Sequence, residues 1–496
     1  MALNNAFGSI KPSQKQQLND SNWLKFNDST VAGDTDTFAQ QYLPEVYEQE
    51  VERYGNRTLS GFLRMVGAEM PMSSDQVIWS EQNRLHVAYN AVANGGANNT
   101  LTFTVGGAGQ AFVENVISAG DTIVILDDTN HTDQKAVVTA SSQAGALATV
   151  VVAPYGVENL SALAATGLKI FVYGSEYAKG VSVTNSTGLA DATGKRSITP
   201  SFTQFSNSPV IIRDKYVVNG SDMAQIGWVE VATEDGTSGY LWYLKAESET
   251  RLRFEDYLEM SVVEGELADS TVGASGDAAY QAGYKGTQGL FAAIEERGNI
   301  NTGFTAANGL VSFDAILKNL DTQGAIEENM LFLNRNTALD FDDMLSGVGS
   351  PTGAGAVYGG GSSFGLFENS EDMALNLGFA GFRRGSYDFY KTDWKYLNDA
   401  STRGAYDTAS ASVEGVLVPA GTSTVYDQIL GTNIRRPFLH VRYRASQADD
   451  RRMKQWLTGS AGGAFTSDLD AMEVNFLSER CLCVQAANNF VLFKGA

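Results

Sequence analysis

The chain has 496 residues, too many for one compact core, and this length predicts two to four domains. Hydrophobic residues make up 43% of the chain, so it can build real cores and is not disordered overall. The net charge of −22 excludes a protein that wraps nucleic acid through basic patches, because binding to phosphate depends on Lys and Arg. It does not exclude a protein that encloses DNA without gripping it.

The N-terminal region is polar and then becomes helical. Residues 1–40 are rich in Asn, Ser, Asp and Gln, which predicts an extended arm that is too poor in apolar side chains to fold alone. Residues 41–66 keep helical spacing with a break at Gly55-Asn56, so we expect a helix followed by a second short helix. The N-terminus has no apolar core for a signal peptide, and no apolar run reaches membrane-spanning length. We therefore expect a protein made in a cytosol.

A low-charge β module follows. Residues 76–92 are typical of a strand, and from 94 to about 180 the sequence consists of short alternating runs separated by Gly, Asn, Asp and Ala. Five or so such runs predict a small β-barrel or sandwich. Residues 195–220 return as polar, extended strand, so the module looks like an insertion between 76–92 and 195–220.

The strongest helix signal is the stretch 239–266, in which no Gly or Pro occurs between Gly239 and Gly265. Its apolar side chains fall on one broad face at 100° per residue. Glu247 and Arg251 interrupt that face four residues apart, with the acid first, in the favourable orientation for a helical ion pair. Arg251 and Glu255 continue the same spacing. Such a helix is a rod of roughly 40 Å, much longer than the average.

The C-terminal half predicts a mixed α/β region that ends in strands. Residues 311–345 alternate helix, strand and helix, and residues 346–366 form a Gly/Ser-rich loop. The last segment, around Cys481 and Cys483, is strongly β, and a C-x-C pair there places both thiols on one strand face. With no further Cys and no nearby His in sequence, two buried structural thiols are favoured over a metal site.

Motifs for chemistry are weak. Gly188–Ser197 departs from a phosphate loop in spacing and lacks the Ser or Thr after Lys195, where Arg196 stands instead. Two clusters of aspartates could bind a cation through their oxygens, but a turn is the favoured interpretation of both. They are Asp127, Asp128 and Asp133, and Asp340, Asp342 and Asp343. No catalytic constellation, metal-ligand spacing or cofactor motif is found, so we expect a non-enzymatic protein without a cofactor.

Taken in order, these segments resemble the major capsid proteins of tailed bacteriophages with the HK97 fold, most of all those of crAss-like phages. The residues that carry the resemblance are YLPEVYEQEVERYGNRTLSGFL at 42–63, DQVIWSEQNRLH at 75–86, FTQFSNSPVIIRDKYVVNGSDMAQIG at 202–227, and the long helix. It covers nearly the whole chain, with 94–180 the least typical part. Some family members cross-link their shells through Lys, Asn and Glu side chains, and no such trio is matched here.

The resemblance implies an α+β, HK97-like fold with an inserted small all-β domain. The implied parts are an N-terminal arm (1–40), peripheral-domain helices (41–75), an extended loop (76–220) carrying the β domain at about 94–180, a peripheral domain (221–300) with a spine helix at 239–266, an axial domain (301–440), and C-terminal strands (441–496) that return to these domains.

The implied function is a structural capsid protein that self-assembles into hexamers and pentamers of an icosahedral head around double-stranded DNA. Its partners would be further copies of itself, with portal and head auxiliary or decoration proteins, and not a membrane. It would be assembled in the bacterial host cytoplasm and located in the virion. The expected assembly contacts are Glu247, Arg251, Lys195 and Arg196.

Two other classes stay open on the sequence alone. One is an acidic multi-domain surface or adhesion protein with a β module, which would call for a secretion signal. The other is an enzyme with the β module as a carbohydrate-binding accessory domain, which would call for a cleft with converging polar groups.

Overall fold

A computed structural model of the chain describes slightly more than two thirds of it in detail. The described residues are 69–81, 86–107, 110, 112–177, 179, 203–221, 230–232, 238–273, 275–305, 309–324, 326–348, 380–399, 402–406, 412–420, 422–427, 432–461, 463 and 465–495. The predicted arm at 1–40, the helices predicted over 41–66 and most of the loop predicted at 346–366 lie outside these residues. The fold is mixed α+β, and strands outnumber helices among the described elements.

The chain divides into two compact units, which are described separately below. One unit comprises Met1–Ile78 and Ser206–Ala496, and the other comprises Trp79–Phe205. The division falls within the strands β2 (Val77–Glu81) and β9 (Thr203–Asn207), which pair with each other in a two-stranded sheet.

The larger unit contains a five-stranded sheet built around one long strand, β22 (Ala471–Val484). β10 (Val210–Asn219) pairs antiparallel with β22 along its whole length, from Val210 opposite Arg480 to Asn219 opposite Ala471. On the other side of β22 lie β20 (Leu439–Arg444) and β21 (Lys454–Gly459), and β1 (Glu69–Met72) pairs parallel with β20.

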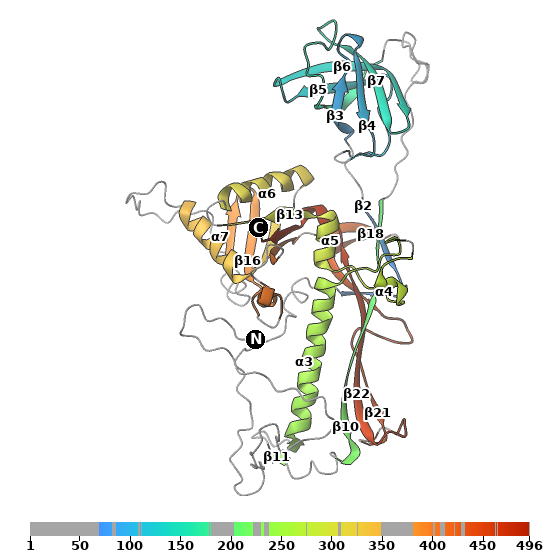
Figure 1. The fold of residues 1–496 in the computed structure, drawn as a ribbon, viewed down its shortest axis with the longest axis vertical. Coiled ribbons are helices and arrows are strands. Elements are labelled where there is room, and N and C mark those ends of the chain that lie inside the picture. Colours follow the sequence, from blue (N-terminus) through green and yellow to red (C-terminus); the bar gives the residue numbers. More distant parts are fainter. Residues whose placement is uncertain are drawn as a thin grey trace, which may run out of the picture. The chain divides into compact units, whose positions relative to one another are not determined.

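The helix α3 (Leu241–Glu264) confirms the long helix that the sequence predicts over 239–266. It runs beside β10 and β22 (Figure 1) and contacts both strands. Its side chains are described from Glu247 onward. Helix α3 ends before Gly265, where a Cβ would come within 2.6 Å of the Ser261 and Thr287 carbonyl oxygens. Only glycine therefore fits the close approach to Thr287 that stops the helix.

A second sheet in the same unit has six strands and carries its own core. Its order is β13 (Asn299–Thr302), β23 (Val491–Lys494), β17 (Val413–Pro419), β14 (Glu328–Leu333), β16 (Tyr387–Asp393) and β15 (Ala380–Arg384). Helices α6 (Gly309–Gln323) and α7 (Arg335–Val348) supply Phe313 and Phe341, whose rings cross at 90° with centres 5.6 Å apart. The helix–strand–helix alternation predicted over 311–345 is thereby confirmed.

Short elements complete the larger unit. They are α4 (Ala278–Gln281), α5 (Leu290–Arg297), α9 (Lys395–Asn398), η3 (Arg403–Tyr406), η4 (Ala487–Asn489), and the paired strands β11 (Glu230–Ala232) with β12 (Ser238–Tyr240) and β18 (Thr422–Asp427) with β19 (Thr432–Pro437).

The smaller unit contains a closed barrel of six antiparallel strands. In barrel order these are β3 (Ala88–Asn94), β4 (Thr100–Thr104), β7 (Leu147–Pro154), β6 (Thr132–Ala144), β5 (Asp121–Asp127) and β8 (Leu168–Ser175), with the turn η1 (Gly96–Asn98) between β3 and β4. Tyr89 and Phe103 fill its core with ring centres 4.3 Å apart. The buried Tyr89 hydroxyl donates to the Glu114 carbonyl oxygen at 2.7 Å, which satisfies its polar atom inside the core.

The strand predicted over residues 76–92 is divided in the structure. Val77–Glu81 form β2, which pairs with β9, whereas Ala88–Asn94 form β3, which belongs to the barrel. The two parts serve different sheets, because Tyr89 and Val92 point into the barrel core and are fully buried there. Hydrophobic alternation reports a strand but not which sheet it joins.

The packing of α3 on the sheet yields a stability prediction. Phe476 of β22 is fully buried, and its ring centre lies 5.7 Å from that of Phe254 on α3. Replacing Phe476 with Ala should lower the free energy of unfolding by about 3–5 kcal/mol, because it leaves a cavity under the helix. Leu457→Ala, at a side chain that is 45% exposed on β21, is the control and should cost much less. Equal losses in denaturant unfolding would show that α3 is not held by this core.

Candidate interaction surface

The long helix α3 covers the sheet with one face and leaves apolar side chains exposed outside it. Phe254 and Leu258 pack against Met472, Val474 and Phe476 of β22. Leu252 and Tyr257 lie on α3 as well, yet each is 43% exposed. At about 100° per residue they point about 140° apart around the helix axis, Tyr257 beside the covered face and Leu252 away from it, so each is a separate apolar point at which another protein chain can make contact.

Glu247 and Arg251 lie on this helix, but they do not pair in the predicted way. The Arg251 Nε lies 3.4 Å from the Glu255 carboxylate one turn further on. Glu247 instead accepts a hydrogen bond of 3.1 Å from Gln455 Nε2 on β21. The predicted Glu247–Arg251 ion pair is therefore wrong: tertiary contact with β21 takes the Glu247 carboxylate away from the helix surface, and Arg251 pairs forward. Their role as assembly contacts stays a prediction.

The C-terminal end of α3 is clamped by charge. Arg403 binds both carboxylate oxygens of Glu264, with its Nη2 at 2.6 Å from Oε2, and its guanidinium lies 4.9 Å from the centre of the Phe291 ring. The Tyr396 hydroxyl donates to the same carboxylate. Burial and this hydrogen bond raise the pKa of Tyr396 well above its usual range. The C-terminal end of α3 is thus held to α5, α9 and η3 through Glu264 and its partners.

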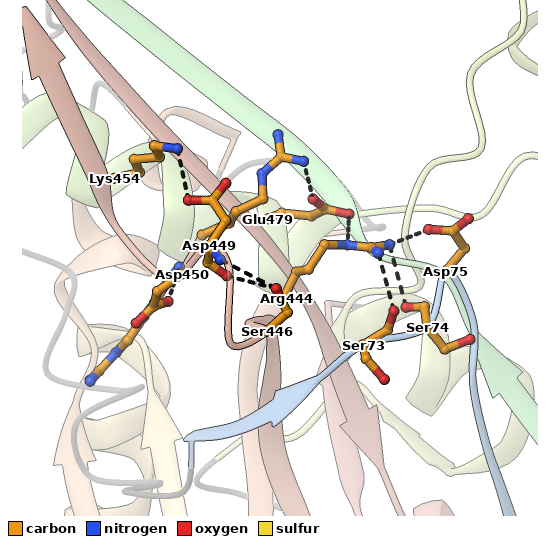
Figure 2. A network of polar contacts seen from close by, with 11 residues as sticks. Ser73, Ser74, Asp75, Arg444, Ser446, Asp449, Asp450, Lys454 and Glu479 are labelled. Carbon is orange, nitrogen blue, oxygen red and sulfur yellow. Dashed lines mark hydrogen bonds and ion pairs between the residues drawn. The ribbon is translucent and has the colours of Figure 1, made fainter.

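A network of charged side chains ties β1, β20, β21 and β22 together (Figure 2). Arg444 on β20 donates from Nε to Glu479 Oε1 at 2.6 Å and pairs through Nη2 with Asp75, while Arg451 Nη1 lies 3.0 Å from the other oxygen of Glu479. Arg444 also donates to the carbonyl oxygens of Ser73 and Ser74. Burial disfavours the charged form of Arg444, but the hydrogen bonds to Asp75 and Glu479 raise its pKa overall.

A second set of charges lies on the opposite side of the sheet. Arg480 follows Glu479 on β22 and so points the other way, where its Nη1 lies 3.7 Å from Glu69 of β1. Arg452 pairs with the same Glu69 carboxylate. Burial lowers the pKa of Arg480, and the charge of Glu69 partly compensates. Glu69 of β1 is therefore linked to β22 through Arg480 on one face, and Asp75, which follows β1, is linked to Glu479 of β22 through Arg444 on the other.

Cationic side chains lie on the sheet face opposite α3. Arg213 of β10 and Lys454 of β21 lie on either side of Leu477 in the strand register. The Arg213 guanidinium and the Lys454 ammonium lie 5.8 and 6.0 Å from the centre of the Trp456 ring. Leu477 is only 6% exposed. The aliphatic stems of Arg213 and Lys454 therefore shield apolar surface that none of the described helices covers. Beside them lies a shallow hollow of about 200 Å³, lined by Asp449, Arg451, Lys454, Trp456 and Leu477.

The two cysteines are core residues of β22. Cys481 and Cys483 are free thiols and are 0% and 1% exposed, so the prediction of buried thiols is confirmed. The register of β20 places His440 directly opposite Cys483, although the two residues are far apart in the sequence. The hydrogen bond with Cys483 and burial raise the pKa of Cys481 far above its usual range. Within the described part of the chain, no three His, Cys, Asp or Glu side chains are placed to hold a metal ion.

The acidic group around Asp127 forms a turn. Asp127 accepts hydrogen bonds from the backbone N–H groups of Thr129, Asn130 and Ala164 at 2.9, 3.0 and 2.6 Å, and from the Asn130 side chain at 2.9 Å. These bonds, led by that from Ala164, lower the pKa of Asp127. The carboxylate is fully used by protein donors, so the turn interpretation holds at this position.

Two of the other acidic candidates form ion pairs. Asp128 pairs with Lys169 at 2.6 Å, and Asp342 pairs with Lys391. The side chain of Asp343 lies outside the described residues, as do Lys195, Arg196 and the whole stretch 188–197. The helices that the structure describes include none long and apolar enough to cross a lipid bilayer.

Comparisons with known proteins add distant structural matches only. No protein-family model and no curated protein matches the chain. A solved structure described as Microbacterium phage Oxtober96 aligns with a TM-score of 0.35 at 9% identity, covering 92% of this chain and 96% of that chain. Another, described as Mycobacterium phage Ogopogo, aligns with a TM-score of 0.32 at 12% identity, covering 64% and 84%. The virus-like particle from Pyrococcus furiosus aligns with a TM-score of 0.26 at 10% identity, covering 59% and 79%. Alignments with such low TM-scores carry no argument about the fold or function of this chain.

The charged network makes a testable contribution to stability. Replacing Glu479 with Ala should lower the free energy of unfolding by about 3 kcal/mol, because Arg444 and Arg451 then lose the carboxylate that lies between them. Asp449→Ala is the matched control: Asp449 pairs with Lys454 at the surface, with both side chains more than 40% exposed, and should cost at most about 1 kcal/mol. Denaturant unfolding at neutral pH measures both. A loss for Glu479→Ala no larger than that of the control would contradict the structural role of the network.

Proposed function

We propose that this chain is the structural, non-enzymatic major capsid protein of a tailed bacteriophage with the HK97 fold, similar to those of crAss-like phages. In this proposal it assembles in the host cytoplasm into hexamers and pentamers of an icosahedral head that encloses double-stranded DNA. The proposal rests on the sequence resemblance together with one structural observation: the 24-residue helix α3 laid along the long antiparallel pair β10–β22.

The arrangement of the larger unit fits the parts that such a protein needs. Helix α3 and the five-stranded sheet correspond to the peripheral domain with its spine helix, and the six-stranded sheet with α6 and α7 corresponds to the axial domain. In this proposal the extended loop predicted over 76–220 leaves through β2 and returns through β9, with the barrel as its inserted β domain. The last part of that range, β10, pairs with β22 and is counted with the five-stranded sheet. Extended elements of this kind bury surface on neighbouring copies when a symmetric shell forms.

The exposed side chains of α3 support an assembly role for this helix. Leu252 and Tyr257 remain 43% exposed in the single chain, Leu252 pointing away from the sheet and Tyr257 lying beside the face that covers it. Burying two such side chains on a neighbour contributes favourably to association, at about 25 cal/mol for each Å² of apolar surface removed from water. Glu247 lies where α3 meets β21, so a neighbouring copy that binds at this edge would contact its carboxylate.

Electron microscopy of the purified protein tests the proposal. Shells, tubes or rings of six and five copies are the expected result, with portal or decoration proteins as further partners in the mature particle. A stable monomer at high protein concentration would overturn the proposal. In that case an acidic surface or adhesion protein becomes the better interpretation.

The predicted assembly contacts give a sharper test. Replacing Glu247 and Arg251 together with Leu should reduce the yield of assembled particles at least tenfold, while the melting temperature of the subunit changes by only a few degrees. The physical reason is that both side chains are accessible at the edge of the helix–sheet contact and not in its dry core.

The matched control replaces the exposed ion pair of Lys169 and Asp128 on the barrel with Leu, and should leave the particle yield unchanged. Particle yield is read from sedimentation velocity and subunit stability from thermal unfolding. Equal loss of assembly and stability in the α3 variant would show that these residues only support folding.

A further inference from the structure

The outer wall of the barrel carries three exposed aromatic side chains, two on β8 and one just after β7, and β5 and β6 lie between these two strands. Phe171 and Tyr173 lie two residues apart on β8 and are 37% and 52% exposed, and Tyr155, which follows β7, is 41% exposed. Leu168 and Ile170 of the same strand point into the barrel core, so Phe171 and Tyr173 point outward. These three residues are called the aromatic face below.

The three side chains belong to one continuous surface. Phe171 lies directly opposite Val124 of β5, and Val124 lies directly opposite Lys135 of β6. The backbone N–H of Tyr155 donates to the Lys135 carbonyl oxygen at 2.9 Å, so Tyr155 borders the same row of residues. Val124 points outward, yet it is only 8% exposed, because its neighbours cover it.

A hydrogen bond fixes the ring of Tyr155 across this wall. Its hydroxyl donates to the carboxylate of Glu176, which lies just beyond the end of β8. This hydrogen bond, with burial and the charges of Glu176 and Tyr173 nearby, raises the pKa of Tyr155 to about 12. The phenol therefore stays protonated at neutral pH, and the ring is held in place before any ligand arrives, which lowers the entropic cost of binding.

The chemistry of this face distinguishes among ligands. The barrel is closed, so it has no free strand edge to which a peptide could add a strand. This face also carries polar groups: the hydroxyls of the two tyrosines, the Glu176 carboxylate bound by Tyr155, and Lys135 in the register row of Val124. The centres of protein interfaces, in contrast, are depleted in charged side chains. A ligand for this face needs an apolar side to stack on rings and hydroxyl groups along its edge to bond to the carboxylate and ammonium.

Sugars have this combination, because the C–H groups on one side of a pyranose ring stack on aromatic rings while its hydroxyl groups point to the edge. Phe171 and Tyr173, two strand residues apart, are spaced by roughly 7 Å and can serve adjacent units of a chain. The Glu176 carboxylate and the net charge of −22 disfavour anionic polysaccharides. We propose that the aromatic face formed by Tyr155, Phe171 and Tyr173 is a binding site for neutral glycan chains.

Binding of immobilised oligosaccharides to the full-length protein tests this proposal. The probes are neutral oligosaccharides of glucose, mannose, galactose and N-acetylglucosamine on biosensor tips, with an oligouronate as the anionic comparison. At least one neutral probe should bind, and the oligouronate should bind at least tenfold more weakly. The measurement works whether the chain is a monomer or a particle, so its failure leaves the proposed capsid function untouched.

Variants identify the surface that binds. Phe171→Ala combined with Tyr173→Ala should weaken binding at least tenfold, whereas Tyr173→Trp, which keeps a ring, should retain it. Tyr284→Ala removes a tyrosine that is 70% exposed in the larger unit and is the matched control. Thermal unfolding checks that the double variant remains folded.

Three results would overturn the proposal: no neutral probe binds, the double variant binds as well as the unaltered protein, or the oligouronate binds best. Loss of self-association by the double variant in sedimentation velocity, without glycan binding by the unaltered protein, would assign the face to contact between copies instead.

Discussion

The larger unit depends on one strand, β22, that is buried on both faces along almost its whole length. Helix α3 covers one face through Phe254 and Leu258, and the stems of Arg213 and Lys454 help to cover the other at Leu477. A strand of 14 residues with three neighbouring strands cannot slip by one residue without moving every side chain to the wrong face. The registers of β10, β20 and β21 are set against this strand, and α3 packs on it.

Local signals in the sequence predict the elements but not their partners. The long helix at 239–266 follows from periodicity and the lack of internal helix breakers, and the strands around 328–333, 387–393 and 471–484 follow from apolar or alternating runs. The pairing of Glu247 with Gln455, and of Arg444 with Glu479, depends on which strands become neighbours in space. The same is true of His440 beside Cys483, because the β20–β22 register and not sequence distance brings them together. The division of residues 76–92 between two sheets has this cause as well.

The two units distribute surface chemistry differently. In the larger unit, ion pairs such as Arg403–Glu264 and Arg444–Glu479 hold elements together, and exposed apolar groups remain on α3. In the barrel, polar turns such as that of Asp127 are satisfied internally, and the outward rings gather on β8 and beside β7. An assembly surface on one unit and a ligand-binding surface on the other are therefore compatible, because no residue is required for both.

Cryo-electron microscopy of particles formed by the purified chain tests the central claim most directly. The account predicts closed shells in which this chain forms six-membered and five-membered rings, with the exposed Leu252 side chain of α3 buried against a neighbouring copy. Shells or fibres in which Leu252 faces solvent, or particles without five-membered rings, would contradict it.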